Sequence, residues 1–420
     1  MNRTVLAEDG TARRSTQGKN GRAFAVIALL AASTFMFITV ENMPIGLLTL
    51  MAPSFETTPA MIGLLVTGYA VIVSLSSIPL TKLSMGIPRR RLLCSAIALL
   101  VLATLSTAFA PNYYFLLGGR ILGALAHAVF WSIVATTAVS LFDRPKHGTV
   151  ISIVFAGSSL GTVLGIPAVV WIANQQGWRL TFLLMSALGV CIFVLLSILL
   201  PGGSRDDEAT SSGSTPDGRT FHVILLTAAV GVSGIFIAQT YITLFLTEAT
   251  GLRTSELSLA LLAAGITGVL GVFMGGWLAP RMPNAAIAGP LALISAAMFC
   301  AYAAAASAML VVVMFAVVAL GFTAFAAAVQ VRVLVVAPGS TDIASAASST
   351  MFNIGIGSGA LIGGAVVEIL DVRTTALASG SLAAIAVLVF LLGLSPAAQR
   401  QVGIRMRNLK KAPLEPGNMQ

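Results

Sequence analysis

Twelve apolar runs, each long enough to cross a lipid bilayer, dominate this chain. They cover residues 24–50, 61–83, 92–110, 114–142, 149–171 and 180–200, and then 221–247, 255–279, 286–305, 308–333, 343–369 and 375–395. A spanning helix needs about 20 apolar residues, because about 30 Å of hydrocarbon is crossed at about 1.5 Å per residue. Only 9% of the residues are charged, against about 25% in soluble domains. The sequence therefore predicts an all-α, polytopic membrane protein with twelve transmembrane helices.

A polar stretch divides the runs into two groups of six. Residues 201–218 read PGGSRDDEATSSGSTPDG, a composition typical of a flexible linker. We expect an N-terminal tail over 1–23, a six-helix half over 24–200, a linker over 201–220, a second half over 221–395 and a C-terminal tail over 396–420. A basic turn after the second run (residues 86–91, GIPRRR) has a relative after the eighth (residues 275–281, GGWLAPR), which indicates duplicated halves around a central cavity.

Glycines spaced four residues apart form a second repeated feature. One ladder lies in the fifth run and the other in the eleventh, six runs later: Gly157, Gly161 and Gly165, and Gly355, Gly359 and Gly363. Such spacing lets helices approach closely. We expect that packing use of both ladders, and we expect the first one, with Pro167 after it, to take part in conformational change.

The basic residues predict the orientation of the chain. With both termini in the cytoplasm, twenty of the 24 Lys and Arg residues fall on that side and three on the opposite side, and Arg120 lies inside a run. This is the bias of the positive-inside rule, so the net charge of +9 requires no nucleic-acid partner. We expect a multi-pass protein of the bacterial cytoplasmic (inner) membrane, in contact with its lipid bilayer, with an uncleaved first span.

Glu41 is the one acidic residue well inside an apolar run, just before Pro44 and Gly46. A carboxyl group at mid-bilayer costs on the order of 2.5–3.5 kcal/mol on insertion scales. It reduces this cost by holding a proton or by finding a cation. We therefore expect Glu41 to be a proton-coupling group rather than a structural buried acid.

One face of the fourth run offers companions for Glu41. Arg120, His127 and Trp131 are spaced i, i+7 and i+11, which places them on one side of a helix. Arg120 and Glu41 both lie about two turns from the outer end, so their approach is plausible; snorkelling outward is the competing use of the arginine. His127 can relay protons or bond a sugar hydroxyl, or donate to a backbone carbonyl. Trp131 can stack on a sugar ring or pack in the bundle.

Four polar side chains in the second half complete the candidate substrate site: Gln239, Tyr241, Gln330 and Asn353. They offer neutral hydrogen bonds of the kind that a sugar needs, and helix–helix hydrogen bonding is the competing use. The three cysteines lie far apart and form no metal pair. Residues 157–161 (GSSLG) match a hydrolase motif, but a spanning helix is the wrong context for it. No metal, cofactor or enzymatic activity is predicted.

With its two basic turns, its glycine ladders and Arg120 in the fourth run, the chain resembles the major facilitator superfamily over essentially its whole length. Residues 120–124 (RILGA) are similar to its fourth-span arginine motif, and residues 163–167 (VLGIP) to the antiporter motif of its drug/proton branch. Residues 126–133 (AHAVFWSI), 353–361 (NIGIGSGAL) and 44–48 (PIGLL) resemble the sugar efflux transporters of the SotB type. The acidic residue that is usual in the basic loop is missing here, which puts loop-gated closure through that residue in doubt.

The resemblance implies proton-driven export of small sugars such as arabinose and galactosides such as IPTG, by alternating access. A multidrug/proton exporter with the same machinery is the alternative, since the fifteen methionines also suit a broad apolar drug site. The expected partners are thus a small sugar or sugar analogue and protons, with the monomer as the functional unit.

Overall fold

The computed structural model describes residues 4–57, 59–201 and 212–394. The first group of elements is α1 (Thr4–Met51), η1 (Ala52–Phe55), α2 (Pro59–Leu83), α3 (Arg89–Ala108), α4 (Tyr113–Val139), η2 (Arg144–Lys146), α5 (His147–Leu160), η3 (Gly161–Gly165), α6 (Ile166–Gln176) and α7 (Trp178–Leu199). The second group is α8 (Gly218–Gln239), α9 (Ile242–Leu244), η4 (Phe245–Ala249), α10 (Thr254–Leu278), α11 (Ala285–Ala303), α12 (Ala308–Val336), α13 (Thr341–Ile369) and α14 (Thr374–Leu394).

Each of the twelve predicted runs corresponds to a helical segment, and α5, η3 and α6 together form the fifth. Eleven segments in the described part of the chain are long and apolar enough to span a membrane. The remaining run corresponds to α2, whose 25 residues exceed the roughly 20 that a span requires. No strand occurs in the described ranges. The predicted all-α, polytopic membrane fold is confirmed.

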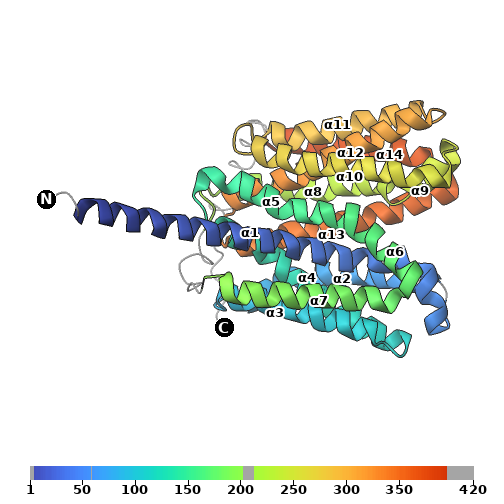
Figure 1. Ribbon diagram of the computed structural model, residues 1–420. Helices are drawn as coiled ribbons and strands as arrows, with labels where there is room; N and C mark the ends of the chain where they lie inside the picture. The colour runs from blue at the N-terminus through green and yellow to red at the C-terminus, as the bar shows by residue number, and fades with distance from the viewer. Residues whose placement is uncertain (1–3, 58, 202–211, 395–420) are drawn as a thin grey trace, which may run out of the picture.

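Two segments differ from their predicted limits. α1 begins at Thr4, so helix extends through most of the stretch predicted as an N-terminal tail and projects beyond the bundle (Figure 1). The seventh run, predicted over 221–247, is interrupted after Gln239. There the Tyr241 hydroxyl donates to the carbonyl of Ala360 on α13 at 3.1 Å, and this contact joins the turn to α13. The predicted C-terminal tail and much of the predicted linker lie outside the described residues.

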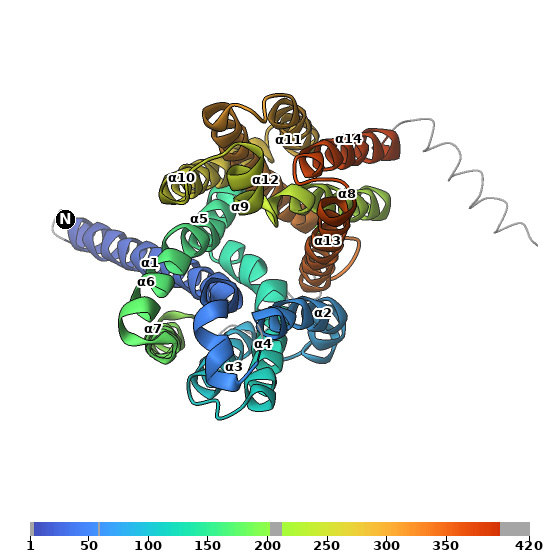
Figure 2. The same ribbon diagram turned by 90° about the vertical axis from the view of Figure 1, so that its right-hand side faces the viewer.

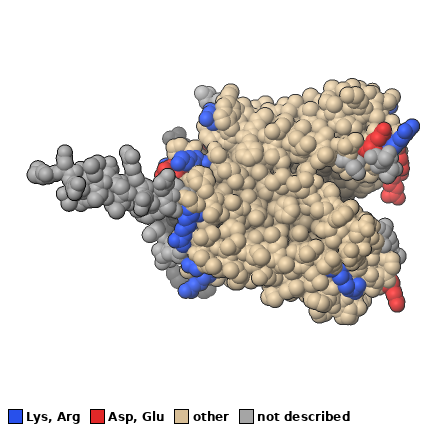
Figure 3. All heavy atoms as spheres, in the orientation of Figure 1, with Lys and Arg blue, Asp and Glu red and all other residues tan. Residues whose placement is uncertain are grey.

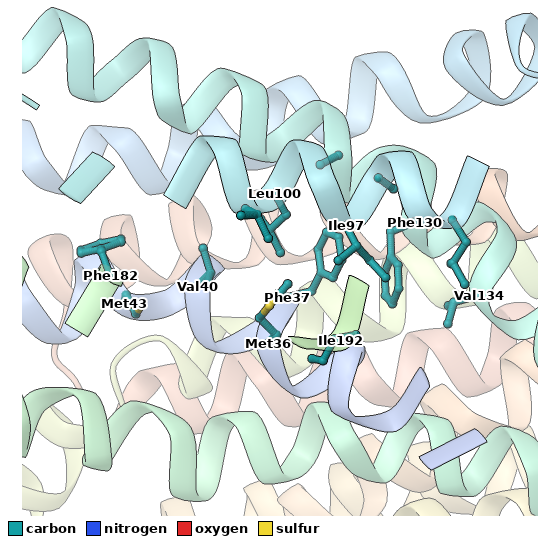
Figure 4. Packing of buried hydrophobic residues seen from close by; sticks show 14 of the residues in the cluster. Met36, Phe37, Val40, Met43, Ile97, Leu100, Phe130, Val134, Phe182 and Ile192 are labelled. Atoms are coloured by element: carbon teal, nitrogen blue, oxygen red, sulfur yellow. The ribbon is translucent and has the colours of Figure 1, made fainter. Parts of the chain in front are cut away.

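The buried apolar residues form separate cores in the two groups of helices. The largest cluster draws its buried members from residues 26–200, and Figure 4 shows Phe37 and Phe130 stacked at its centre. Two further clusters draw theirs from residues 221–390, with Ile151 of α5 as the exception. Seen along the bundle, the helices form two groups that meet through α5 and α13 (Figure 2).

A short sequence repeat marks the start of both groups. Residues 21–27 read GRAFAVI and residues 218–224 read GRTFHVI. Arg22 donates to the carbonyl of Leu199 at the end of α7 at 2.8 Å, and Arg219 donates to the carbonyl of Gly393 at the end of α14 at 2.5 Å. Each arginine thus satisfies carbonyls that a helix end leaves without intrahelical partners. In each group, the same arginine contact therefore joins the first helix to the last one.

The two groups meet tightly at the end of the bundle from which α1 projects. Arg89 Nη2 on α3 lies 3.2 Å from Asp342 Oδ1 on α13, and the Asp342 side chain is fully buried. Ser152 on α5 donates to the carbonyl of Val272 on α10 at 3.0 Å. The opposite end of the molecule is hollowed between the groups (Figure 3). The helices therefore lie closer together at one end than at the other.

Candidate functional site

Pro44 creates an unsatisfied carbonyl inside α1, about two turns before the helix ends at Met51. A proline has no backbone N–H, so the carbonyl four residues earlier, that of Val40, loses its intrahelical partner. Arg120 on α4 replaces that partner: its Nη1 donates to Val40 O and its Nη2 to Glu41 O, both at 2.9 Å. The planar guanidinium suits two adjacent acceptors. Arg120 is thereby fixed to the backbone of α1.

The Glu41 side chain meets His127, not Arg120. His127 Nδ1 lies 3.5 Å from Glu41 Oε2, and no ion pair within 4.0 Å joins the described Glu41 carboxylate to Arg120. Both side chains are largely buried, at 17% exposure for Glu41 and 5% for His127. His127 Nδ1 has no hydrogen-bond partner, so a small movement would let the imidazole bond the carboxyl group. The arrangement can hold and pass a proton.

Tyr69 on α2 is a member of this cluster that the sequence analysis missed. The Arg120 guanidinium carbon lies 4.4 Å from the centre of the Tyr69 ring, within the range of a cation–π interaction. The Tyr69 hydroxyl donates to Gly123 O on α4 at 3.2 Å, and its ring meets that of His127 edge-on at 5.5 Å. The sequence signal that could have identified Tyr69 is its hydroxyl group inside an otherwise apolar run.

Trp131 extends the cluster along α4 toward α5. Its ring lies 5.8 Å from that of His127 and 5.4 Å from that of Phe155 on α5. The indole Nε1 is buried and has no hydrogen-bond partner. A buried donor without a partner is costly, so a ligand hydroxyl at this point would be bound favourably. The predicted face of Arg120, His127 and Trp131 is present on α4.

Three of the four polar residues predicted in the second half make hydrogen bonds within that half. Tyr241 bonds Ala360 O, as described above. Gln330 Nε2 donates to Ser345 Oγ at 3.0 Å, and Asn353 Nδ2 donates to Ser349 O at 2.9 Å. Gln239 is half-buried at the end of α8. The structure thus shows helix–helix or intrahelical hydrogen bonds for three of them and does not bring the four into contact with the Glu41 cluster.

The glycine ladders are close helix contacts. A Cβ atom added to Gly157 would lie 1.9 Å from Ala31 O of α1. One added to Gly161 would lie 2.8 Å from Phe35 O, and one added to Gly165 would lie 2.2 Å from Thr39 Oγ1. The α13 ladder contacts α8 in the same way: Cβ atoms on Gly355, Gly359 and Gly363 would lie 2.9 Å from Ala229 O, 2.4 Å from Ser233 O and 2.5 Å from Ile237 O. The packing use expected of both ladders is present.

The first ladder ends in an irregular turn. Residues Gly161–Gly165 form a π-helical turn, and Pro167 follows it near the start of α6, exposed on the surface. Such bulges are frequent at functional sites. The GSSLG sequence lies across α5 and the start of this turn, in helix throughout. No group of three or more His, Cys, Asp or Glu residues able to hold a metal ion occurs in the described part of the chain.

Comparison with solved structures identifies the fold. The human organic anion transporter MFSD10 superposes with a TM-score of 0.72 at 12% identity, over 88% of this chain and 99% of that one. The Escherichia coli fucose:proton symporter FucP superposes with a TM-score of 0.70 at 14% identity, over 89% of this chain and 99% of that one. At such identities these likenesses show a shared fold alone.

Sequence comparison identifies the family. The model of the Major Facilitator Superfamily matches residues 30–356. A protein of Helicobacter pylori strain P12, named as a probable sugar efflux transporter, is 33% identical over 362 residues, which cover 86% of this chain and 93% of that protein. One of the same name from Mannheimia succiniciproducens is 31% identical over 368 residues, 87% of this chain and 93% of that protein. The chain therefore belongs to the Major Facilitator Superfamily of membrane transporters.

Proposed function

We propose that this transporter exports small neutral sugars, such as arabinose and galactosides such as IPTG, in exchange for protons. The observation that carries the proposal is the buried pair of Glu41 and His127, 3.5 Å apart, with Arg120 fixed beside it. An ionisable group inside a span is costly, and its usual use is an ion or proton path. Membership of a transporter superfamily agrees with the prediction that the chain is not an enzyme.

The substrate class rests on the relatives and on chemistry at the site. The similar proteins carry the name of probable sugar efflux transporters. Trp131 offers an indole N–H without a partner and an aromatic face, and sugars bind to such faces through their C–H surfaces and hydroxyl groups. Gln330 and Asn353 keep the amide oxygens that their described hydrogen bonds do not use, and these can accept from sugar hydroxyls.

Transport would proceed by alternating access around this site. The tight contacts at the end from which α1 projects correspond to a closed cytoplasmic side, so Glu41 takes its proton from the hollowed outer side. Protonation removes the negative charge near His127 and Arg120 and favours rocking of the two halves. One inward proton supplies about 2.3 kcal/mol per 100 mV and about 1.4 kcal/mol per pH unit. At one proton per cycle, this drives roughly hundredfold accumulation outside.

The charge distribution supports the proposed orientation in the inner membrane. Lys and Arg gather at the end of the bundle from which α1 projects (Figure 3). The positive-inside rule favours the cytoplasm for that end, which supports the proposal that both termini are cytoplasmic. We propose a monomer as the working unit, because each chain carries both halves and the whole Glu41 cluster.

The test is proton movement in liposomes that contain the purified protein. Adding IPTG or arabinose should change the internal pH with wild-type protein, and Glu41→Gln should abolish the change while the protein still inserts and folds. A sugar response that persists in Glu41→Gln would remove Glu41 from the mechanism. A response to a cationic or aromatic drug, with none to sugars, would replace the proposed substrate by that of a multidrug exporter.

A further inference from the structure

Pro44 differs from another proline inside a spanning helix of this protein, Pro79 in α2. Both remove a backbone N–H, and both therefore leave a carbonyl without its intrahelical donor. In α1 that carbonyl, Val40 O, receives a hydrogen bond from Arg120 on a different helix. Arg120, which is only 4% exposed, thus bonds the backbone carbonyl that Pro44 leaves without a helical donor.

This docking determines where the positive charge of Arg120 lies. Two of its nitrogens are committed to Val40 O and Glu41 O, and its face lies against the ring of Tyr69. The carboxylate of Glu41 instead lies next to His127 Nδ1. In a low-dielectric site, a carboxylate in direct contact with a guanidinium strongly favours its ionised form. Keeping the two apart leaves the carboxyl group free to gain and lose a proton.

Few other groups can influence Glu41. The titratable or charged side chains facing it in the described structure are Arg120 and His127 from α4 and Tyr69 from α2. The other helices packed on α1 place theirs elsewhere: α5 has His147 at its cytoplasmic end, α7 has Arg179 at its outer end and an exposed Cys191, and α3 has its basic residues at its start and Cys94 one turn on. The position of Arg120 is therefore the main variable.

We propose that Pro44 is a positioning residue for the proton site: the carbonyl that it frees at Val40 holds Arg120 on the backbone of α1 and off the carboxylate of Glu41. The inference rests on the proposed role of Glu41 in binding the transported proton. With an N–H restored at position 44, Val40 O regains its helical partner, and the guanidinium turns to the carboxylate, the stronger acceptor. Glu41 then takes up its proton only at lower pH.

Infrared titration of the full chain in lipid tests this directly. The carboxylic-acid C=O band that Glu41→Gln removes reports protonation of Glu41 without any need for transport. We expect Pro44→Ala to move the midpoint of this band to lower pH by about one unit or more. Pro79→Ala, the matched change in α2, should leave it in place. In an Arg120→Gln background, Pro44→Ala should no longer move it. Alanine favours helix, so the variant should fold.

An unchanged midpoint in Pro44→Ala, or a shift to higher pH, would overturn the inference, as would an equal shift in Pro79→Ala. A wild-type protein without a band that depends on Glu41 would overturn it as well, because the carboxyl group would then take up no proton. The proposed function fails separately. A shifted band in Pro44→Ala, together with wild-type liposomes that show no proton movement on adding sugar, would uphold the role of Pro44 and reject sugar/proton exchange.

Discussion

At the scale of single residues, the site depends on how two aromatic side chains use their polar tips. The Tyr69 hydroxyl donates to Gly123 O, and the face of its ring contacts the Arg120 guanidinium. Trp131 keeps its indole N–H without a partner. Tyr69 is therefore suited to hold the site in shape, whereas Trp131 is suited to meet a ligand.

Substitution of Tyr69 should separate its two interactions. Tyr69→Phe keeps the ring under Arg120 and should lower the free energy of unfolding by about 1 kcal/mol, the net worth of one hydrogen bond. Tyr69→Leu also removes the cation–π contact and should cost about 1–2 kcal/mol more, because this contact is shielded from water. Thermal unfolding in detergent measures both. Tyr114→Leu, at 81% exposure, is the control; equal stability of the two Tyr69 variants would contradict this account.

Replacing Trp131 by Phe should weaken sugar binding without disturbing the fold. A phenyl ring keeps an aromatic face toward His127 and Phe155 but is smaller than indole and carries no N–H. A neutral hydrogen bond contributes about 0.5–1.5 kcal/mol, so the KM for sugar efflux should rise about three- to tenfold. Trp171→Phe on the exposed side of α6 should leave the KM unchanged. An unchanged KM in Trp131→Phe would exclude this N–H from the sugar site.

At the scale of the elements, the glycine ladders fix the distance between α1 and the α5 segment, and between α8 and α13. Each glycine faces a carbonyl or side chain of its partner helix at a distance that leaves no room for a Cβ atom. We expect helix pairs held in this way to move as units. The first ladder therefore ties the segment that carries Glu41 to α5, which also contacts the second half through α10.

Gly157→Ala tests this coupling. Its Cβ atom would lie 1.9 Å from Ala31 O, so α1 and α5 must separate, at a cost of about 1–3 kcal/mol. We expect a lower melting temperature and slower transport. Gly357→Ala in α13, where nothing lies within 4 Å of the added atom, should behave like wild type. If both variants melt at the wild-type temperature, the close packing of the ladder does not limit stability.

At the scale of the whole molecule, the ion pair of Arg89 and Asp342 joins the two halves at the proposed cytoplasmic end. Breaking one side of a buried pair costs about 3–5 kcal/mol, and the pair exists only while this end is closed. Asp342→Asn should therefore shift the population toward an inward-open arrangement. Spin labels at the exposed positions of Lys82 and Arg281 should move apart. Asp371→Asn, in the loop before α14, should not change their distance; an unchanged distance in Asp342→Asn would contradict this role for the pair.

The sequence by itself determined the number of spans, the buried acid and the face of α4, because a bilayer demands about 20 apolar residues per helix and makes each charged exception stand out. It also contains the GRxFxVI repeat, but only the structure shows that the arginine of each copy bonds the end of another helix. The tertiary structure alone decided which groups these polar side chains bond. Arg120 has five donors and can choose between a carboxylate and carbonyls; that choice depends on Pro44 in α1 and on Tyr69, which lies 51 residues before it in the chain. The amides of Gln330 and Asn353 likewise took neighbours that no spacing in the sequence specifies.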